Sequence, residues 1–333
     1  MRFLLRDLCL LILIILIYAG YFQYSMFIST PLNIENGETF TIKSGSNLLQ
    51  ISHQLTKKNI TPLSPSYLYW YGRYKNTAHL IKAGEYHIEA SKTLPELLTQ
   101  FIEGEVVQHT FTIVEGMTSK QLIASLAADN RLVHTLKAES LKEILLLIEG
   151  ASRHGEGEFA PDTYYFLAGT TDIAILKRAH KLMQDNLAEA WLKKADNLPY
   201  ETPYEALIMA SIIEKETGNA SERSQIAGVF VRRLEKGMRL QSDPTIIYGM
   251  GEQYTGNISK KDLMRDTTYN TYTRSGLPPS PIALTGKAAI EAALNPAGGD
   301  SLYFVAMGRE GRHVFSNNLT DHNKAVKKYQ LKK

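Results

Sequence analysis

The sequence predicts an α+β protein that is anchored in a membrane by its N-terminus. Three observations predict this fold class. Residues 8–34 form an uncharged, largely apolar stretch, and two short β-rich runs are each followed by a turn glycine and a helical stripe. Helical stripes then alternate with loops and one β-hairpin over the rest of the chain. With 333 residues, 44% of them hydrophobic and 21% charged, the chain has room for two or three globular domains.

The N-terminal stretch has the length and composition of a membrane-spanning helix, for which about 20 apolar residues suffice. Arg2 and Arg6 lie on its short side, so the positive-inside rule places the N-terminus in the cytoplasm. A cleaved signal peptide is the alternative, but the Ala-Gly-Tyr at 19–21 is a poor cleavage site. We therefore expect residues 1–30 to be a cytoplasmic tip and an uncleaved, single-pass anchor, with the remaining chain outside the cytoplasm.

Composition and motifs exclude several function classes. The net charge of +3 is too small to indicate nucleic-acid binding, and no basic run interleaves with aromatic residues. The single cysteine, Cys9, lies in the apolar stretch, so the exported part has no disulfide and no cysteine catalysis. Phosphate-binding, dinucleotide-binding and serine-hydrolase motifs are missing, and the histidines lack zinc spacing. We expect a site without metal or cofactor and no nucleic-acid partner.

Residues 36–105 are predicted to form a small module. Its expected elements are a strand at 40–42, a turn at Gly45, a helix at 48–55, a Tyr-rich segment at 67–74, a strand at 84–88 and a helix from Thr93 or Leu94 to Gly104. The Tyr-rich segment contains Tyr69, Trp70 and Tyr74. These aromatic side chains form either a platform for sugars or part of the module's own core, and the sequence leaves both readings open.

Residues 106–333 are predicted to form a larger α+β region, which begins with a second copy of the strand, glycine turn and helical stripe at 111–126. The further expected elements are a helix at 141–148, a Gly- and Pro-rich loop at 156–164, a helix at about 172–195, a helix at 204–216, a helix that starts at Asn219 or Ser221 and stops at Gly237, a loop or short strand at 239–244, loops at 269–272 and 277–281, a helix from Thr285 to Leu294, a hairpin of 301–306 with 312–315, and a terminal helix capped by Thr320.

The helix at 204–216 carries the first candidate for chemistry. Its positions 206–213 are apolar on every side, which is typical of a buried helix, yet it ends in Glu214 and Glu216. At about 100° per residue these two side chains point about 200° apart. Glu216 has Ile213 and Ile212 one turn back and lies on the more apolar face, where burial raises the pKa of a carboxyl. A carboxyl still protonated near neutral pH is a candidate general acid. The alternative is that both glutamates only close the helix and pair with nearby cations.

The sequence that follows is more specific. Glu222 comes three residues after Asn219, as in a capping box, and this alone would explain it. Gln241 and Asp243 lie in the next loop, where Pro244 favours an extended backbone at Asp243. The run Tyr269-Asn270-Thr271-Tyr272 and the run Gly276-Leu277-Pro278-Pro279-Ser280-Pro281 come later. In this order, and with Glu156-Gly157 and Pro161-Asp162-Thr163-Tyr164 before the helix, these motifs resemble the endolytic murein transglycosylase (YceG-like) family over nearly the whole chain.

The resemblance implies an endolytic peptidoglycan lytic transglycosylase, a lyase, held in the cell inner membrane with its catalytic part in the periplasm. It implies that 36–105 are a LysM-like module, which binds N-acetylated glycans, and that 106–333 are the YceG-like catalytic domain. Glu216 is then the catalytic residue, since Glu216-Thr217 resembles the Glu-Ser pair of other lytic transglycosylases. The expected substrate-binding residues are Glu222, Gln241, Asp243, Asn270 and Tyr272.

The implied reaction cuts the β-1,4 bond between N-acetylmuramic acid and N-acetylglucosamine and leaves a 1,6-anhydro end. It requires one acid/base and no second, nucleophilic carboxylate. The expected partners are glycan strands and, by resemblance, peptidoglycan synthases. Two alternatives stay open: a hydrolytic muramidase that uses Asp243 or Glu222 with Glu216, and a glycan-binding membrane scaffold without catalysis.

Overall fold

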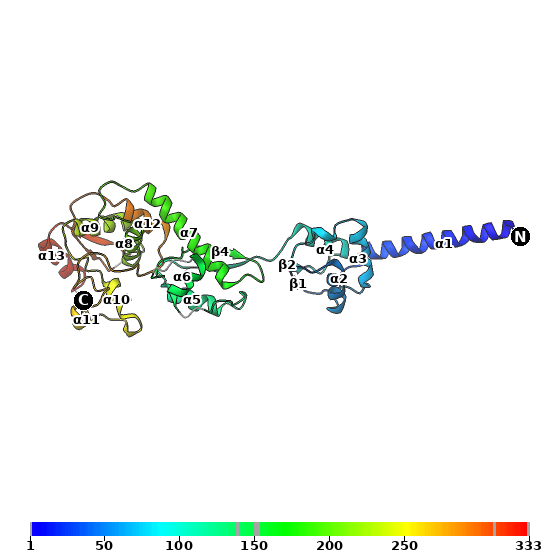
Figure 1. Cartoon of the computed structure of the whole chain (residues 1–333), viewed down its shortest axis with the longest axis horizontal. Helices are drawn as coiled ribbons and strands as arrows, with labels where there is room; N and C mark the ends of the chain where they lie inside the picture. Colours follow the sequence, from blue (N-terminus) through cyan, green and yellow to red (C-terminus); the bar gives the residue numbers. More distant parts are fainter. Residues whose placement is uncertain (1, 138–139, 150–153, 309–310, 332–333) are drawn as a thin grey trace. The chain divides into compact units, whose positions relative to one another are not determined.

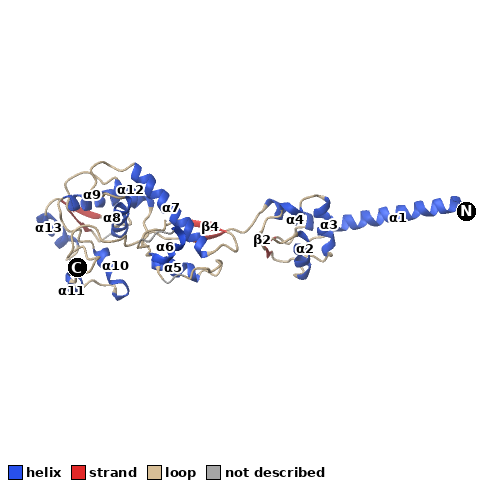
Figure 2. Ribbon diagram, viewed as in Figure 1, coloured by secondary structure: helices blue, strands red, loops and turns tan. Residues whose placement is uncertain are grey.

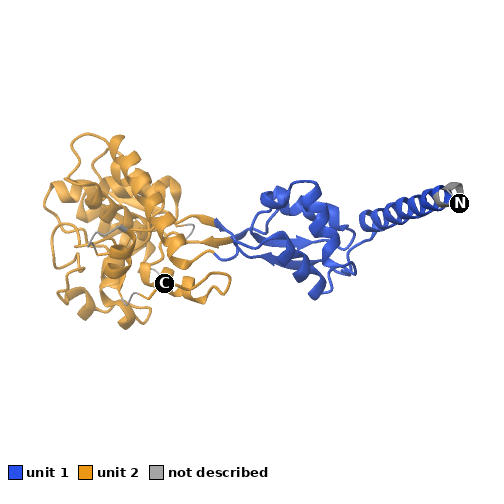
Figure 3. Cartoon of the chain, turned by 45° about the vertical axis from the view of Figure 1, so that its right-hand side comes forward, with its two compact units in different colours: residues 1–109, 165–169 blue, residues 110–164, 170–333 orange. Residues whose placement is uncertain are grey.

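The computed structural model describes residues 2–137, 140–149, 154–308 and 311–331. The chain divides into two compact units, one of residues 1–109 and 165–169 and the other of residues 110–164 and 170–333 (Figure 3). Helices make up most of the regular structure, and the strands are short (Figure 2). They pair two by two: β1 (Glu38–Ile42) with β2 (Gly84–Ile88), β3 (His109–Thr112) with β4 (Thr163–Phe166), and β5 (Tyr303–Ala306) with β6 (His313–Ser316). The mixture of helices and small sheets confirms the α+β class.

Helix α1 (Arg2–Ser29) begins the first unit (Figure 1). Its 28 residues correspond to about 42 Å at 1.5 Å per residue, which exceeds the ~30 Å hydrocarbon core of a bilayer. Residues 6–29 are long and apolar enough to cross a membrane, and the large apolar side chains from Leu8 to Phe22 are exposed. Phe27, near the end of the helix, is instead buried against the module that follows. This agrees with the predicted anchor.

The rest of the first unit is built around a two-stranded sheet. Its elements are β1 (Glu38–Ile42), α2 (Leu48–Lys57), α3 (Pro65–Tyr74), the 3₁₀ turn η1 (Ala78–Leu80), β2 (Gly84–Ile88) and α4 (Leu94–Glu103). Strands β1 and β2 are antiparallel, with Phe40 opposite Tyr86. Both side chains pack on Phe101 of α4, and all three are fully buried. Thr93 caps α4 and Gly104 ends it in the left-handed conformation, as the sequence predicts.

The two predicted repeats of strand, glycine turn and helix are both present. Gly45 and Gly116 have φ values of 81° and 78°, which favour glycine, and they reverse the chain after β1 and β3. Asn47 and Thr118 then form capping boxes that start α2 and α5 (Ser119–Ala128). The same local chemistry therefore gives the same local structure at two places in the chain.

From residue 109 onward helices predominate. The elements are β3 (His109–Thr112), α5 (Ser119–Ala128), α6 (Leu141–Glu149), β4 (Thr163–Phe166), α7 (Asp172–Leu192), α8 (Pro203–Glu216), η2 (Ala220–Glu222), α9 (Arg223–Glu235), α10 (Asp243–Met250), η3 (Gly251–Gln253), α11 (Lys260–Met264), α12 (Lys287–Leu294), β5 (Tyr303–Ala306), β6 (His313–Ser316) and α13 (Leu319–Tyr329). The predicted hairpin is confirmed as the antiparallel pair β5 and β6; the tip of its turn, 309–310, lies outside the described residues.

Helix α8 is the centre of the second unit. It contacts α7, α9, α10 and α12, which surround it in Figure 1. Residues 206–213 are all buried, as expected for a helix that is apolar on every side. A capping box between Thr202 and Glu205, with Pro203 in the first turn, starts the helix. Thr217 ends it in an extended conformation. The core around α8 holds the helix terminus, and therefore Glu216, in a defined place.

Several predicted boundaries are wrong, each by a few residues. Asp243 does not lie in an extended loop but begins α10, because Pro244 in the first turn lacks only an N–H that would be unpaired there anyway. Helix α12 starts after Gly286 rather than at Thr285, whose hydroxyl donates to the Ala283 carbonyl. Asn318, rather than Thr320, caps α13 by accepting a hydrogen bond from the Asp321 N–H.

Candidate active site

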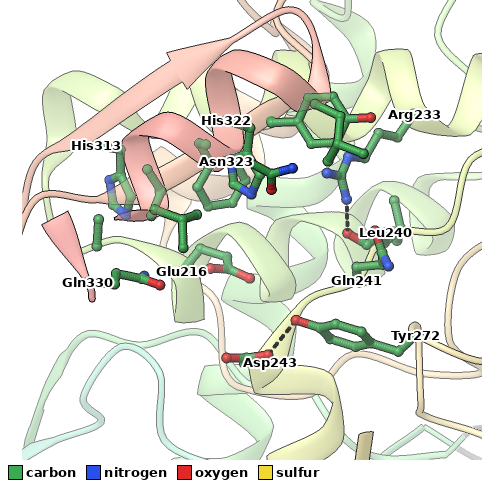
Figure 4. Close-up of a pocket in the computed structure, with 16 residues that line it drawn as sticks. Glu216, Arg233, Leu240, Gln241, Asp243, Tyr272, His313, His322, Asn323 and Gln330 are labelled. Atoms are coloured by element: carbon green, nitrogen blue, oxygen red, sulfur yellow. Dashed lines mark hydrogen bonds between the residues drawn. The ribbon is translucent and has the colours of Figure 1, made fainter. Parts of the chain in front are cut away.

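A cavity of about 560 Å³ lies in the second unit, at the C-terminal end of α8 (Figure 4). Its walls come from α8, α9, the loop before α10, the loop after α11, the β5–β6 hairpin and α13. The lining residues are Glu216, Arg233, Leu240, Gln241, Asp243, Tyr272, Tyr303, Phe304, Val305, Ala306, His313, Leu319, His322, Asn323, Val326 and Gln330. Four of the six predicted site residues, Glu216, Gln241, Asp243 and Tyr272, are among them, although up to 56 positions of sequence separate them.

Glu216 is the half-buried carboxyl at the end of α8. The Ser242 hydroxyl donates a hydrogen bond of 2.5 Å to its Oε1. Burial and the nearby Asp243 raise the pKa of Glu216 to about 7, against the opposing effects of the Ser242 hydrogen bond and of Arg233. A carboxyl with this pKa is partly protonated at neutral pH, so it can both give and take a proton.

Asp243 and Tyr272 form a second polar pair on the same cavity. The Tyr272 hydroxyl donates to Asp243 Oδ1 at 2.6 Å, which Figure 4 marks. Burial and this carboxylate raise the pKa of Tyr272, so the phenol stays protonated. Asp243 is exposed to solvent, whereas Tyr272 is half-buried. The two carboxyl groups of the cavity therefore lie in different environments, since Asp243 is exposed to water whereas Glu216 is half-buried.

The loop that carries Gln241 is joined to the loop after α11. Gln241 has a φ of 53°, unusual for a residue other than glycine, and its N–H donates to the Thr271 carbonyl. The Ser242 N–H donates to the Thr271 hydroxyl, which also hydrogen-bonds Thr245. These bonds hold Ser242 where it reaches Glu216. They also turn the Gln241 side chain, which is exposed, toward the cavity (Figure 4).

Asn270 has a different position from the one the sequence predicts. It is 1% exposed and does not line the cavity. Its amide donates to the carbonyls of three residues, Asp262, Leu263 and Arg265, and its carbonyl accepts from the Tyr272 N–H. Asn270 thus folds the loop that presents Tyr272.

Glu222 also lies outside the cavity lining, and the capping box predicted for it is not formed. Asn219 caps the turn η2 through the Ser221 N–H, while the Glu222 carboxylate turns away to β6. It accepts the backbone N–H of His313 at 3.1 Å and lies 2.8 Å from Nδ1 of the His313 ring. His313 does line the cavity, so Glu222 acts on the site by holding this imidazole.

Arg233 is a cavity residue that the sequence reading missed. It is 7% exposed, and its guanidinium donates to the carbonyls of Leu302 and Leu240, both at 2.7 Å. The guanidinium also lies over the Tyr303 ring, 5.1 Å from its centre. Arg233 therefore joins the loop before α10 to β5. The sequence did contain a signal for a buried Arg233, because this residue lies three positions after Phe230 and four after Val229, on the buried stripe of its helix.

Helix α13 supplies another wall that the sequence did not reveal. His322, Asn323, Val326 and Gln330 line the cavity from this helix. Their spacing is that of one helical face, but the face is mixed in polarity, so the sequence contains no signal for it. His322 stacks on Tyr303 with ring centres 5.1 Å apart, and its Nδ1 has no hydrogen-bond partner among the residues that the structure describes.

Glu214 points away from the cavity, as the helical geometry predicts. Its carboxylate accepts the Gly286 N–H at 3.0 Å and lies 3.7 Å from the Arg223 guanidinium. Burial raises the pKa of Glu214 too, but its partners are the start of α12 and an arginine. The structural explanation, helix closure and ion pairing, therefore fits Glu214 but not Glu216.

Glu156, in the Gly- and Pro-rich loop, is a buried carboxyl that supports α10. It is 2% exposed and accepts hydrogen bonds from the Ser119 N–H and hydroxyl and from the Tyr248 hydroxyl at 3.1 Å. Burial raises the pKa of Glu156 in spite of these bonds. Tyr248 belongs to α10, which begins at Asp243. Glu156 therefore helps to hold the helix that carries Asp243.

Comparison with known proteins gives consistent results. The profile of the YceG-like family matches residues 40–328. The endolytic murein transglycosylase of Bacillus subtilis (strain 168) is 30% identical over an alignment that covers 94% of this chain and 91% of that protein. The endolytic murein transglycosylase of Streptococcus pneumoniae serotype 2 (strain D39 / NCTC 7466) is 31% identical over 95% of this chain, which spans 63% of that protein's length.

A crystal structure of a yceG-like protein from Listeria monocytogenes, determined at 2.6 Å, is similar as well. It is 32% identical and has a TM-score of 0.54, with 87% of this chain and 99% of that chain covered. Because the family profile and these relatives extend over most of the sequence, the chain belongs to the YceG-like family.

Proposed function

We propose that the protein is a membrane-anchored lytic transglycosylase that cuts peptidoglycan glycan strands internally. The bond is the β-1,4 link from N-acetylmuramic acid to N-acetylglucosamine, and the product end is 1,6-anhydro-N-acetylmuramic acid. The observation that carries the proposal is Glu216, a carboxyl with a pKa of about 7 on a cavity of about 560 Å³. Relatives that match nearly all of this chain are named endolytic murein transglycosylases, which supports the reaction class.

In the proposed reaction Glu216 protonates the oxygen that leaves when the glycosidic bond breaks, and the transition state resembles an oxocarbenium ion. The resulting Glu216 carboxylate then takes the proton of the muramyl C6 hydroxyl, whose oxygen bonds to C1. One proton is given and one is taken, so no water is consumed. The Ser242 hydrogen bond stabilises the carboxylate between the two steps.

The remaining site residues have binding and positioning roles in this proposal. Gln241, Asp243 and Tyr272 line the cavity and supply hydrogen-bonding groups for sugar hydroxyls. Asn270 and Glu222 act indirectly, through the Tyr272 loop and through His313. No group of three or more His, Cys, Asp or Glu among the residues that the structure describes is arranged to hold a metal ion.

A hydrolytic muramidase is the second candidate, and one observation favours it. Asp243 places a second carboxyl on the cavity that holds Glu216, and paired carboxylates are typical of glycoside hydrolysis. The two reactions differ in their products, since hydrolysis adds one water and leaves a reducing end. A non-catalytic scaffold that binds glycans through its N-terminal module is the third candidate.

The proposed organisation assigns one task to each part of the chain. Residues 1–30 form the single-pass anchor in the inner membrane, with the N-terminus in the cytoplasm, and α1 has the length for this. Residues 36–105 form a LysM-like, glycan-binding module, and residues 106–333 form the periplasmic catalytic domain. The proposed setting is cell-wall synthesis and remodelling, with peptidoglycan synthases as partner proteins.

The decisive experiment compares Glu216→Gln with Glu214→Gln on purified glycan strands. Glutamine keeps the shape of the side chain but cannot transfer the proton, so Glu216→Gln should lower the rate by about 10²- to 10⁴-fold. Glu214→Gln is the matched control from the same helix end, outside the cavity, and should retain most of the activity. Thermal unfolding of each variant checks that the fold is kept.

Mass spectrometry of the fragments identifies the reaction. Wild-type protein should produce ends that are lighter by one water than hydrolytic ends. Full activity of Glu216→Gln would refute the assignment of the acid, and hydrolytic ends would move the protein to the muramidase class. If wild-type protein leaves the strands uncut, the scaffold function replaces both.

A further inference from the structure

A second cavity, of about 690 Å³, lies in the first unit beside the end of α1. Tyr24 and Phe27 of α1 form one side of it, and Tyr67, Trp70 and Tyr74 of α3 form the other. We refer to it as the aromatic groove. Its aromatic lining differs from that of the cavity at Glu216, and nothing in the proposed reaction uses it.

Helix α3 is joined to α1 by specific contacts at this groove. The Tyr67 hydroxyl donates to Gln23 Oε1 at 2.9 Å. Phe27, only 3% exposed, stacks on Tyr67 with ring centres 6.0 Å apart and contacts Tyr71 at 5.0 Å. The aromatic side chains of the Tyr-rich segment thus form two sets. Tyr67 and Tyr71 pack toward α1 and the core of the module, whereas Trp70 and Tyr74 are exposed.

Aromatic side chains as exposed as those of the second set are unusual on a surface that faces only water. Trp70 and Tyr74 are 66% and 84% exposed, and Tyr24 across the groove is 53% exposed. If the apolar core of the membrane starts at Leu8, about 20 helical residues at 1.5 Å each bring its far side to Phe27. Because α3 packs on Gln23 and Phe27, the groove then lies at the depth of the membrane–water interface. Trp and Tyr are the side chains enriched at this depth, where their rings face both lipid and water.

The stretch of chain that contains α3 is basic. Between Glu38 and Glu85 the chain carries six lysines and arginines and no aspartate or glutamate. Arg73 and Lys75 are among them, next to Tyr74 and exposed at the end of α3. Basic residues close to a membrane are attracted to anionic lipid headgroups.

From these observations we propose that the aromatic groove binds the anionic phospholipids at the outer face of the membrane that α1 crosses. Trp70 and Tyr74 insert among the headgroups and the upper acyl chains, and Arg73 and Lys75 bind the lipid phosphates. A glycan strand fits the site less well, because the groove lies at the depth of the lipid headgroups. The inference rests on the proposed membrane anchor, and it adds a second attachment that holds the module against the lipid surface.

Tryptophan fluorescence can test the proposal because the chain contains only two tryptophans, Trp70 and Trp191. The full-length Trp191→Phe variant, with Trp70 as its single tryptophan, is reconstituted into phosphatidylglycerol vesicles that carry bromine on the upper acyl chain. Bromine quenches only tryptophans that reach the lipid. We expect Trp70 to lose most of its emission, and to lose less in otherwise identical phosphatidylcholine vesicles. In the Trp70→Phe variant, Trp191 reports on the second unit and should be unquenched.

Two further measurements complete the test. The Arg73→Gln/Lys75→Gln double variant in the same background should remove the difference between phosphatidylglycerol and phosphatidylcholine vesicles. Resistance to alkaline carbonate extraction separately reports whether α1 is inserted, so failure of the anchor is distinguished from failure of the groove.

Three outcomes would overturn the proposal for protein that is inserted. In the first, Trp70 stays unquenched, or Trp70 and Trp191 are quenched alike. In the second, soluble glycan strands added to the vesicles restore the emission of Trp70, which would make the groove a sugar site. In the third, quenching falls as the protein-to-lipid ratio rises, which would show that a second copy of the chain covers the groove.

Discussion

The Ser242 hydroxyl donates a 2.5 Å hydrogen bond to the Glu216 carboxyl, although the two residues lie 26 positions apart in the chain. Ser242 is 1% exposed and is held by the Thr271 hydroxyl on its N–H. This bond favours the charged form of Glu216, whereas burial and Asp243 favour the neutral form. The balance of these effects, a pKa of about 7, is the property on which the proposed chemistry depends.

The activity should depend on the protonation of Glu216. A general acid must carry its proton when the bond breaks, so kcat/KM should be high below the pKa of about 7 and fall roughly tenfold per pH unit above it. Initial rates on glycan strands, measured from pH 5 to pH 9, check this. A rate that stays level through pH 9 would contradict the role of Glu216 as the acid.

The titration of Glu216 should also make the folding stability of the protein decrease as pH rises. The pKa of Glu216 is raised in the folded state from its ordinary 4.5 to about 7, so the folded protein holds the extra proton more tightly than the unfolded chain. The stabilisation is complete below pH 4.5 and is lost as pH rises to 7, by up to about 3 kcal/mol. Glu216→Gln cannot titrate, so its stability relative to wild type should increase from pH 5 to pH 8. Urea unfolding at both pH values measures the difference, and an equal offset at both would exclude this linkage.

Replacing Ser242 by alanine should raise the pKa of Glu216, because the hydrogen bond that favours the carboxylate is removed. We expect the fall in kcat/KM to move to higher pH by about one unit. Ser280→Ala is the matched control, since Ser280 is equally buried but hydrogen-bonds Tyr269 instead. The measurement is the pH profile of kcat/KM for each variant. A Ser242→Ala profile that coincides with that of the wild type would show that the Ser242 hydrogen bond does not affect the pKa of Glu216.

Replacing Asp243 by asparagine should shift the profile the other way. The negative charge of Asp243 raises the pKa of Glu216, so its removal should move the fall in kcat/KM to lower pH. Tyr272→Phe removes the hydrogen bond to Asp243 but keeps the charge, so it separates the two effects. The fragments made by Asp243→Asn should still carry 1,6-anhydro ends. Loss of all cleavage, with wild-type ends found to be hydrolytic, would instead make Asp243 the partner carboxylate of a muramidase.

The proposed topology, with the N-terminus in the cytoplasm, rests on Arg2 and Arg6 on the short side of α1 and on the length of that helix. A reporter that is active only in the cytoplasm should be inactive when fused after Lys333 and active when fused before Met1. The two fusions serve as controls for each other. The reverse pattern of activity would invert the orientation of the anchor.

The elements that depend on local chemistry were predictable from the sequence. The capping of α4, the glycine turns after β1 and β3, the β5–β6 hairpin and the buried α8 all follow from residues that are close in the chain. The helical period also separates Glu214 from Glu216, because an offset of two residues places their side chains on opposite faces. The motifs near residues 241–243 and 270–272 then predicted where candidate polar groups for the cavity are found.

The tertiary structure decided which of these groups act together. Sequence spacing could not show that Ser242 reaches Glu216, that Arg233 and α13 form cavity walls, or that Glu222 holds His313 instead of capping its own helix. Nor could it show that Asn270 supports a loop from inside, or that Trp70 is exposed while Tyr71 packs on Phe27. Hydrogen bonds, burial and charge effects act over a few ångströms in space, whereas periodicity reports only on neighbours along one element. The pKa of Glu216 is therefore a property of the folded chain, and only the identity and direction of its carboxyl are properties of the sequence.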